Sequence, residues 1–317
     1  AHGGIAGYGV DSQISGCINK GDITSTAPSV GGIIGNGIDS QISDCINDGD
    51  IEATRNNLQH WAGGIAGMME IGKEGATSVV SDCINNGSIT SGGSSSKYAV
   101  GGIIGATESQ DDAVNTGEVT IINSINNGEI KATTNWAYVG GIVGITDGGQ
   151  VFFPKVGKIN STIINCLNTG TVTGTSYVSG IGTVQAHEAM NTNIEFCINQ
   201  GVITGSGTPT AIFAVYSKKD GTVTIKDSYY QAQSGLEATA VDQEGGNFTI
   251  ENLQEIPTNK EWLADLNESI SAYNTAHPDE LKALYWVFDV NDKLTFGVPV
   301  PTIEGDTPFE ESTEITI

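Results

Sequence analysis

A five-residue pattern recurs along the first two thirds of this 317-residue chain: Cys or Ser, Ile or Leu, Asn, any residue, Gly. Successive copies begin roughly 30–40 residues apart, a period that is typical of solenoids. In a solenoid each unit packs mainly on its neighbours, so the repeat predicts one elongated domain rather than two globular ones. The six copies begin at Cys17, Cys45, Cys83, Ser124, Cys166 and Cys197.

Two further short segments accompany each copy. Gly-Gly-Ile-X-Gly lies upstream, as at residues 31–35, and a β-branched segment such as Asp22-Ile23-Thr24 lies downstream. Such short runs, rich in β-branched residues and separated by turn residues, indicate strands and are too short for helices. Three short strands per unit predict an all-β fold, a right-handed parallel β-helix (β-solenoid) of about seven repeats over residues 1–250. A β-sandwich is the structural alternative, but it gives no reason for the identical Cys position in every copy.

Residues at one repeat position would form columns along the axis, because β-helix rungs stack about 4.8 Å apart. The Asn of each copy could then hydrogen-bond to its neighbours as a ladder. We interpret the Cys column as small buried side chains, since Ser124 replaces one of them. Disulfides between adjacent rungs are the alternative, although the five cysteines are an odd number. The Gly-Gly pair would allow a tight turn or the close approach of another segment.

The pattern changes towards the C-terminus. Apolar residues recur at helical spacing from Trp262 onward, behind a capping box formed by Thr258 and Glu261. Strand-like runs on both sides of the turn at 291–292 predict a β-hairpin. We expect residues 251–298 to form a helix-plus-hairpin cap on the open end of the solenoid. Residues 299–317 are rich in Pro, Glu and Thr and are expected to be a linker or disordered tail.

The charge balance limits the partners. The chain has 37 acidic and 13 basic residues, a net charge of -24. Nucleic-acid binding needs clustered Lys and Arg, so no nucleic acid is expected, and anionic membranes and polyuronates are disfavoured. The sequence contains no run of 18 apolar residues, so no membrane insertion is expected either. Because the chain opens directly into a repeat without a polar cap, we expect a signal peptide or further repeats before Ala1.

Gly-Ile-X-Gly followed by Cys-Ile-Asn-X-Gly-X-Ile resembles the GLUG repeat family of bacterial surface and secreted proteins. The resemblance covers roughly residues 1–230, with Ile where the family's name has Leu. It implies a β-solenoid at the cell surface or outside the cell, with an adhesive or structural role. It supplies no catalytic residues.

Aromatic residues that precede the Gly-Gly strands could form a row along one flank and stack on sugar rings, or could simply pack laterally. The longest connections, at 68–79, 106–121 and 145–162, are expected to project as loops from one edge. The last contains an apolar run that either folds over the flank or forms a contact patch. The candidate ligand-binding residues are Trp61, Tyr98, Trp136, Tyr138, Tyr177, Phe152 and Phe153.

Candidate catalytic and metal-binding groups are few. Pairs such as Asp111 with Asp112, or Asp44 with Asp48 and Asp50, raise acid–base chemistry or a calcium site. The chain lacks the Gly-Gly-X-Gly-X-Asp array of calcium-binding β-rolls and the common nucleophile motifs, so a solvated acidic face is the better interpretation. We expect no catalytic residue, no metal and no other cofactor, with calcium as the open alternative.

We therefore expect a non-enzymatic, extracellular or cell-surface protein that acts as an adhesin-like binding module or a structural stalk. Its partner would be a host or bacterial glycan or surface protein. The rival is a glycan-degrading β-helix enzyme, which would require two acids within about 5–10 Å of each other beside the aromatic residues. A third possibility is a self-assembling surface component, in which the open N-terminal rung stacks on another copy.

Overall fold

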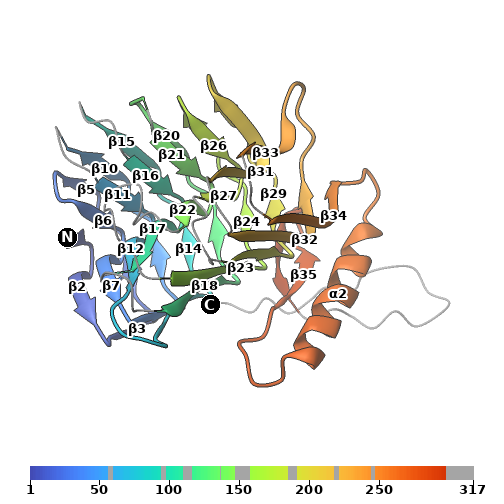
Figure 1. Ribbon diagram of the computed structural model, residues 1–317, viewed down its shortest axis with the longest axis horizontal. Coiled ribbons are helices and arrows are strands. Elements are labelled where there is room, and N and C mark those ends of the chain that lie inside the picture. The colour runs from blue at the N-terminus through green and yellow to red at the C-terminus, as the bar shows by residue number, and fades with distance from the viewer. Residues whose placement is uncertain are drawn as a thin grey trace. The chain divides into compact units, whose positions relative to one another are not determined.

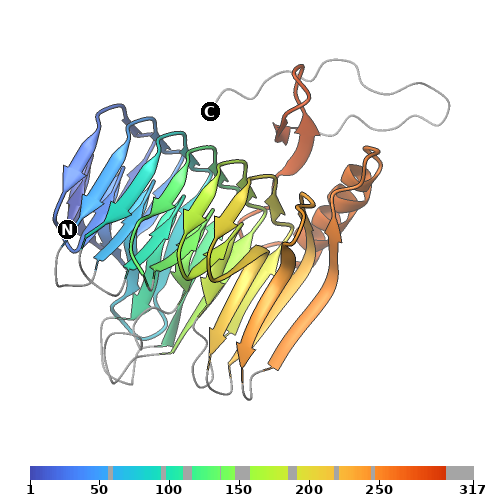
Figure 2. The ribbon, with the colours of Figure 1, turned by 90° about the horizontal axis from the view of Figure 1, so that it is seen from above.

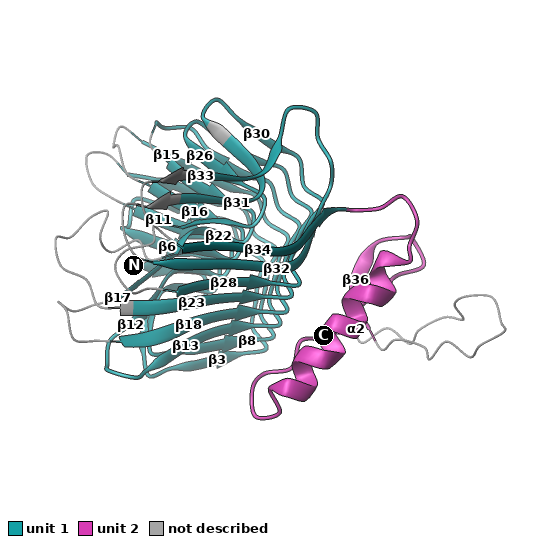
Figure 3. Ribbon diagram, turned by 45° about the vertical axis from the view of Figure 1, so that its right-hand side comes forward, with its two compact units in different colours: residues 1–255 teal, residues 256–317 magenta. Residues whose placement is uncertain are grey.

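The computed structural model confirms the predicted parallel β-helix. The chain winds repeatedly through three sheets, A, B and C, in which every pairing between rungs is parallel (Figures 1 and 2). Two compact units, Ala1–Glu255 and Ile256–Ile317, are described separately (Figure 3). The structure describes residues 1–55, 60–93, 98–109, 116–135, 137–146, 158–184, 191–217, 221–243 and 247–297.

Sheet A is bent at the Gly-Gly-Ile sequence, so most rungs contribute two strands to it. The strands before the bend are β1 (His2–Gly3), β6 (Ser29–Gly31), β11 (His60–Gly63), β16 (Tyr98–Gly101), β21 (Ala137–Gly140) and β26 (Tyr177–Ser179). Those after it are β2 (Ala6–Val10), β7 (Ile34–Ile38), β12 (Ala66–Ile71), β17 (Ile104–Ser109), β22 (Val143–Thr146) and β27 (Gly182–Val184). The last two rungs continue the sheet with β31 (Thr208–Ser217) and β33 (Glu237–Gln243).

Sheet B is bent at the Cys position, and sheet C has one strand per rung. In sheet B, β3 (Gln13–Ser15), β8 (Gln41–Ser43), β13 (Thr77–Ser81), β18 (Thr116–Ile122), β23 (Lys158–Ile164) and β28 (Asn191–Glu195) precede the bend. The strands β4 (Ile18–Asn19), β9 (Ile46–Asn47), β14 (Ile84–Asn85), β19 (Ile125–Asn126), β24 (Leu167–Asn168) and β29 (Ile198–Asn199) follow it, and β32 (Thr222–Tyr230) and β34 (Asn247–Glu255) complete the sheet. Sheet C consists of β5 (Ile23–Ser25), β10 (Ile51–Thr54), β15 (Ile89–Gly92), β20 (Ile130–Ala132), β25 (Val172–Gly174) and β30 (Ile203–Gly205).

The bend in sheet B has a clear local cause. The residue immediately before each Cys or Ser has a positive φ, and Gly, Asp and Asn adopt this left-handed conformation at little cost. Phe196 is the exception, with φ 56° in a position that favours short polar side chains. The others are Gly16, Asp44, Asp82, Asn123, Asn165 and Asp227.

The predicted Asn ladder is confirmed. Asn47 Nδ2 donates to Asn85 Oδ1 at 2.8 Å and to the carbonyl oxygen of Gly49 at 2.8 Å, and this arrangement repeats along the column. The bonds from one Asn to the next span 2.7–2.8 Å, which is ideal geometry. The members are Asn19, Asn47, Asn85, Asn126, Asn168 and Asn199.

The ladder explains why the second Gly of each pair carries no side chain. A Cβ on Gly102 would overlap both the side chain of Asn126 and the carbonyl oxygen of Gly141 on the next rung. Sheet A is therefore pressed against the Asn ladder at its bend. The contact separates two apolar cores, one containing Ile65 and Ile103 and the other containing Ile89 and Val100.

The Cys column matches the interpretation of small buried side chains. All five cysteines are free, and Cys17 alone among them is half-buried rather than buried. Cys83 Sγ donates to the carbonyl oxygen of Ser81 at 3.1 Å, and Ser124 Oγ makes the equivalent bond to Ile122 at 3.0 Å. Ser replaces Cys here because both can donate to the carbonyl oxygen two residues earlier.

The second unit contains the predicted helix and hairpin. Helix α2 (Trp262–Ala276) buries Trp262, Leu263, Leu266 and Ile270, and β35 (Tyr285–Phe288) pairs antiparallel with β36 (Leu294–Gly297). Asn267 exchanges two hydrogen bonds with the backbone of Trp286, which ties the helix to the hairpin. The predicted capping box is wrong, because Glu261 makes no side-chain cap bond and instead accepts a bond from Asn259.

Candidate functional site

The bend of sheet A brings together side chains on its outer face, away from both cores. Trp61 lies before the bend and Met68 after it, yet both belong to one packed cluster with Ala106 and Tyr138. Side chains from both arms can meet only if the outer face is concave at the bend. This concave outer face is the candidate site.

Strand register arranges the outer-face residues in three rows. The first contains Trp61, Ala99, Tyr138 and Tyr177 on successive rungs. The second contains Tyr8, Asn36, Met68 and Ala106, and the third contains Val10, Ile38, Glu70 and Glu108. We use the term outer-face site for Tyr8, Asn36, Trp61, Glu70, Glu108 and Tyr138.

The predicted aromatic row exists in part. Trp61, Tyr138 and Tyr177 share the first row, and the rings of Tyr138 and Tyr177 stack with centroids 4.9 Å apart. Trp61 and Tyr138 are nearly buried, at 6% and 5% exposure, so they pack as well as line the face. Trp136, Phe152 and Phe153 lie outside the described residues.

The prediction is wrong for Tyr98, which lies on the inner face. It is fully buried, contacts the ring of His60 edge-on at 4.0 Å and donates to the carbonyl oxygen of Arg55 at 2.8 Å. Successive residues of a strand point to opposite faces. Ala99, and not Tyr98, is the partner of Trp61 and Tyr138, so a difference of one residue places Tyr98 in the core.

Glu70 and Glu108 were missed because the sequence assigned 68–79 and 106–121 to loops. The structure places residues 68–71 and 106–109 in the strands β12 and β17, and residues 77–79 and 116–121 in the strands β13 and β18. A usable signal was present, because Glu70 follows Gly64 at the same separation as Glu108 follows Gly102. Repeat alignment would have placed the two carboxyl groups in one column.

The two carboxyl groups are direct neighbours in register on adjacent strands, which are about 4.8 Å apart. Both are buried, with 6% and 4% of their surfaces exposed. Burial, and then the charge of Glu70, raise the pKa of Glu108 to about 8. Glu108 therefore holds its proton at neutral pH, and its OH can donate a hydrogen bond.

Asn36 completes this polar group from the neighbouring rung. Its Nδ2 donates to Glu70 Oε2 at 2.6 Å, while its Oδ1 is buried and has no hydrogen-bond partner. Buried polar atoms without partners are rare in folded proteins. An acceptor is thus left unused beside the carboxyl pair.

The outer-face site reaches solvent at the first rung. Tyr8 is 58% exposed and Val10 is 45% exposed, whereas their neighbours in register, Asn36 and Ile38, are buried. Tyr8 is therefore an accessible aromatic ring in the same row as Asn36. Tyr8 follows its Gly-Gly pair, whereas the predicted aromatic row consisted of residues that precede one, so the sequence did not single out Tyr8.

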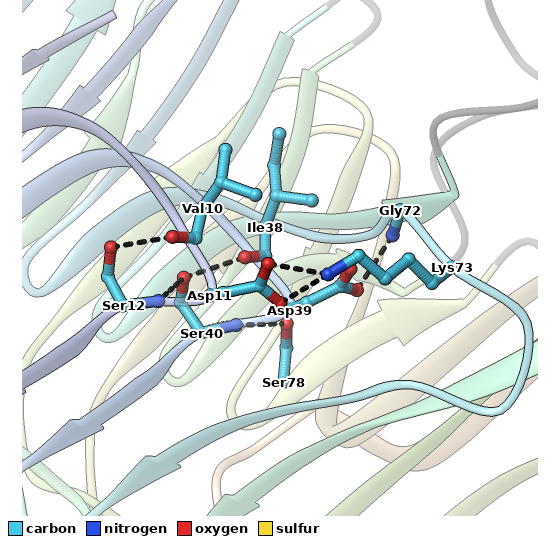
Figure 4. A network of polar contacts seen from close by, with 9 residues as sticks. All are labelled: Val10, Asp11, Ser12, Ile38, Asp39, Ser40, Gly72, Lys73 and Ser78. Atoms are coloured by element: carbon cyan, nitrogen blue, oxygen red, sulfur yellow. Dashed lines mark hydrogen bonds and ion pairs between the residues drawn. The ribbon is translucent and has the colours of Figure 1, made fainter.

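A polar network holds the strand ends beside this site (Figure 4). Ser78 Oγ and the N–H of Asp39 both donate to the carbonyl oxygen of Glu70, at 2.8 and 3.0 Å. Asp39 in turn accepts a bond from the N–H of Gly72 at 2.8 Å, and Lys73 forms an ion pair with Asp11. The ion pair of Lys73 and Asp11 is exposed and contributes little to stability, while the hydrogen bonds to the carbonyl oxygen of Glu70 fix its backbone.

Within the described residues, no group of three or more His, Cys, Asp or Glu side chains is arranged to hold a metal ion. Asp48 and Asp50 instead accept hydrogen bonds from Asn86 and Ser88 on the next rung, and Asp44 occupies a bend of sheet B. Asp111 and Asp112 lie outside the described residues. None of the helices in the part of the chain that is described has the length and apolar character to cross a membrane.

No protein-family model and no curated protein matches the chain. Among solved structures, a proposed immunoglobulin A1 protease from Bacteroides ovatus is similar at 15% sequence identity and a TM-score of 0.35. The match covers 92% of this chain and 86% of that protein. A likeness this distant carries no inference about activity.

Proposed function

We propose that this protein is an extracellular or cell-surface β-helix that binds glycans through the outer-face site without cleaving them. The observation that supports this most directly is the occurrence, on one concave face, of aromatic rings and buried polar acceptors. Sugar rings present apolar C–H faces that stack on aromatic rings, and hydroxyl groups that bond to carboxyl and amide oxygens. We also propose that the repeats are related to the GLUG family, and an adhesin-like role fits that relationship.

Tyr8 is the side chain to test first, because it is accessible. Tyr8→Ala removes the exposed ring without opening a core cavity, and Ile18→Ala is the matched control on the same rung, at 49% exposure in sheet B. We expect Tyr8→Ala to weaken binding to an array-selected glycan at least tenfold and Ile18→Ala to leave it unchanged. Absence of binding by the wild type to any glycan of a broad array would refute the proposal.

A glycan-cleaving enzyme is the second candidate, because Glu70 and Glu108 are two neighbouring carboxyl groups beside aromatic residues. Retaining glycosidases use carboxyl groups about 5 Å apart, one protonated and one ionised. The test is the release of reducing ends from bound glycans by wild type, Glu70→Gln and Glu108→Gln. Turnover by the wild type that both variants abolish would replace binding by catalysis as the function.

Self-association is a further proposal for the first rung. Ile5 and Ile18 are 48% and 49% exposed there, and apolar side chains beside unpaired strand edges can stack on a second copy. Light scattering at high protein concentration tests it, since a monomer at all concentrations excludes this mode. The same measurement shows whether Tyr8→Ala acts on glycan binding or on assembly.

A further inference from the structure

We propose that Asn36, Glu70 and Glu108 form a polar subsite that makes the outer-face site selective for neutral or amino sugars and rejects acidic ones. This inference rests on the proposed function and specifies its ligand class. The subsite lies on adjacent rungs of β7, β12 and β17, in or next to the row that begins at the exposed ring of Tyr8.

Two of the three side chains in the subsite, Asn36 and Glu70, present acceptors to a ligand, and only the protonated carboxyl group of Glu108 can donate. Asn36 Nδ2 donates a hydrogen bond to Glu70 Oε2, whereas Asn36 Oδ1, which can only accept, is buried without a partner. Glu70 carries carboxylate oxygens, of which Oε2 already accepts a hydrogen bond from Asn36, and the oxygens of an ionised carboxylate accept hydrogen bonds but never donate them. A sugar hydroxyl or ammonium group can donate to these oxygens, whereas a second carboxylate cannot.

The charge of the subsite excludes acidic ligands. Glu70 and Glu108 are in register and buried, and the repulsion between them contributes to keeping Glu108 protonated. An incoming uronate or sialate would bring another negative charge into the same poorly solvated region. Lys73, at the adjoining corner, is already paired with Asp11, and the chain as a whole carries a net charge of -24.

Tyr8 and the subsite would divide the recognition between them. The exposed ring of Tyr8 offers a stacking surface that any pyranose can use, whatever its charge. The buried oxygens of the subsite distinguish one sugar from another. Leaving a buried polar group without a hydrogen bond costs more free energy than forming that bond gains. Loss of Tyr8 should therefore lower affinity for all ligands, and changes in the subsite should alter selectivity.

The test compares neutral ligands with counterparts that carry a carboxylate, lactose with sialyllactose and glucose oligomers with glucuronate-containing ones, and it includes glucosamine oligomers as the amino ligand. We expect the wild type to prefer the neutral and amino ligands to the acidic ones at least tenfold. Glu70→Gln should reduce this preference at least fivefold, and Asn36→Ala should lower the affinity for neutral ligands at least tenfold. Glu52→Gln, an exposed carboxyl change on sheet C, is the control and should alter neither.

Circular dichroism and thermal unfolding show whether each variant folds. If Glu70→Gln does not fold, Asn36→Asp provides the opposite perturbation, because an added carboxylate should increase the rejection of acidic sugars. An unchanged preference in the variants, or a wild-type preference for acidic sugars, overturns the inference. So does binding that EDTA abolishes, because the oxygens would then serve a cation.

The outcomes separate this inference from the proposed function. Glycan binding that depends on Tyr8 but not on Asn36 or Glu70 leaves the proposed function standing and refutes the subsite. A wild type that binds no glycan refutes both.

Discussion

Replacing Glu108 by Gln should stabilise the protein at neutral and alkaline pH and leave its stability unchanged in acid. Burial and the neighbouring charge of Glu70 raise the pKa of Glu108 from 4.5 to about 8. Between these two values the unfolded chain releases a proton that the folded protein retains, so folding stability falls as the pH rises. The penalty is complete above the folded pKa.

The magnitude follows from the size of the shift. One pKa unit corresponds to about 1.4 kcal/mol, so the penalty reaches about 3 kcal/mol at pH 7 and about 5 kcal/mol above pH 8. Gln has nearly the shape of the protonated carboxyl group and cannot ionise. Glu108→Gln should therefore recover on the order of 3 kcal/mol at pH 7 and essentially nothing at pH 4.

Urea unfolding of the wild type and Glu108→Gln at pH 4, 6 and 8 measures the effect. Glu52→Gln removes an exposed carboxyl group of the same type and should show no comparable pH-dependent gain. The reasoning is refuted if the stability difference between wild type and Glu108→Gln is the same at pH 4 and pH 8. Stabilisation at pH 4 alone would reverse the sign and place a charged Glu108 in the folded state.

Three further changes test the β-helix itself. Asn85→Ala removes two ladder hydrogen bonds and a bond to Gly87, and should lower the free energy of unfolding, measured with urea, by about 3 kcal/mol. Asn127→Ala, which removes an exposed hydrogen bond to Asn86, should lower it by less than about 1 kcal/mol. Equal losses of stability in the two variants would refute a role for burial. Gly102→Ala should destabilise by about 3 kcal/mol or prevent folding, because its Cβ overlaps the neighbouring rung, and a normal melting temperature would contradict this. Cys83→Ser should change stability by less than about 1 kcal/mol, as Ser124 shows for the equivalent position, and a larger loss in thermal unfolding would mean that the thiol packs in a way Ser cannot match.

The repeat alone was sufficient to predict the β-helix, because each residue that recurs at the same position of the repeat has a local physical role. Asn forms the ladder, the second Gly of each pair makes room for it, and Gly, Asp or Asn before Cys supplies the left-handed bend. Each of these residues interacts with the neighbouring rung through residues that also belong to the repeat, so the sequence itself shows both partners. An eighth turn, formed by β33 and β34, keeps only the left-handed Asn252 at its bend and lacks the Gly-Gly-Ile and Asn-X-Gly patterns, so the sequence missed it.

The outer-face site required the tertiary structure. Whether an aromatic residue faces in or out depends on its parity along the strand, and one residue separates the buried Tyr98 from the row of Trp61. Glu70 and Glu108 follow their Gly-Gly pairs at the same separation, but the segments that contain them differ in length, and strand register shows that the two residues are neighbours. The sequence determined the columns of the β-helix because they repeat in nearly every rung. Folding decided the site because its side chains differ from rung to rung and meet only across rungs.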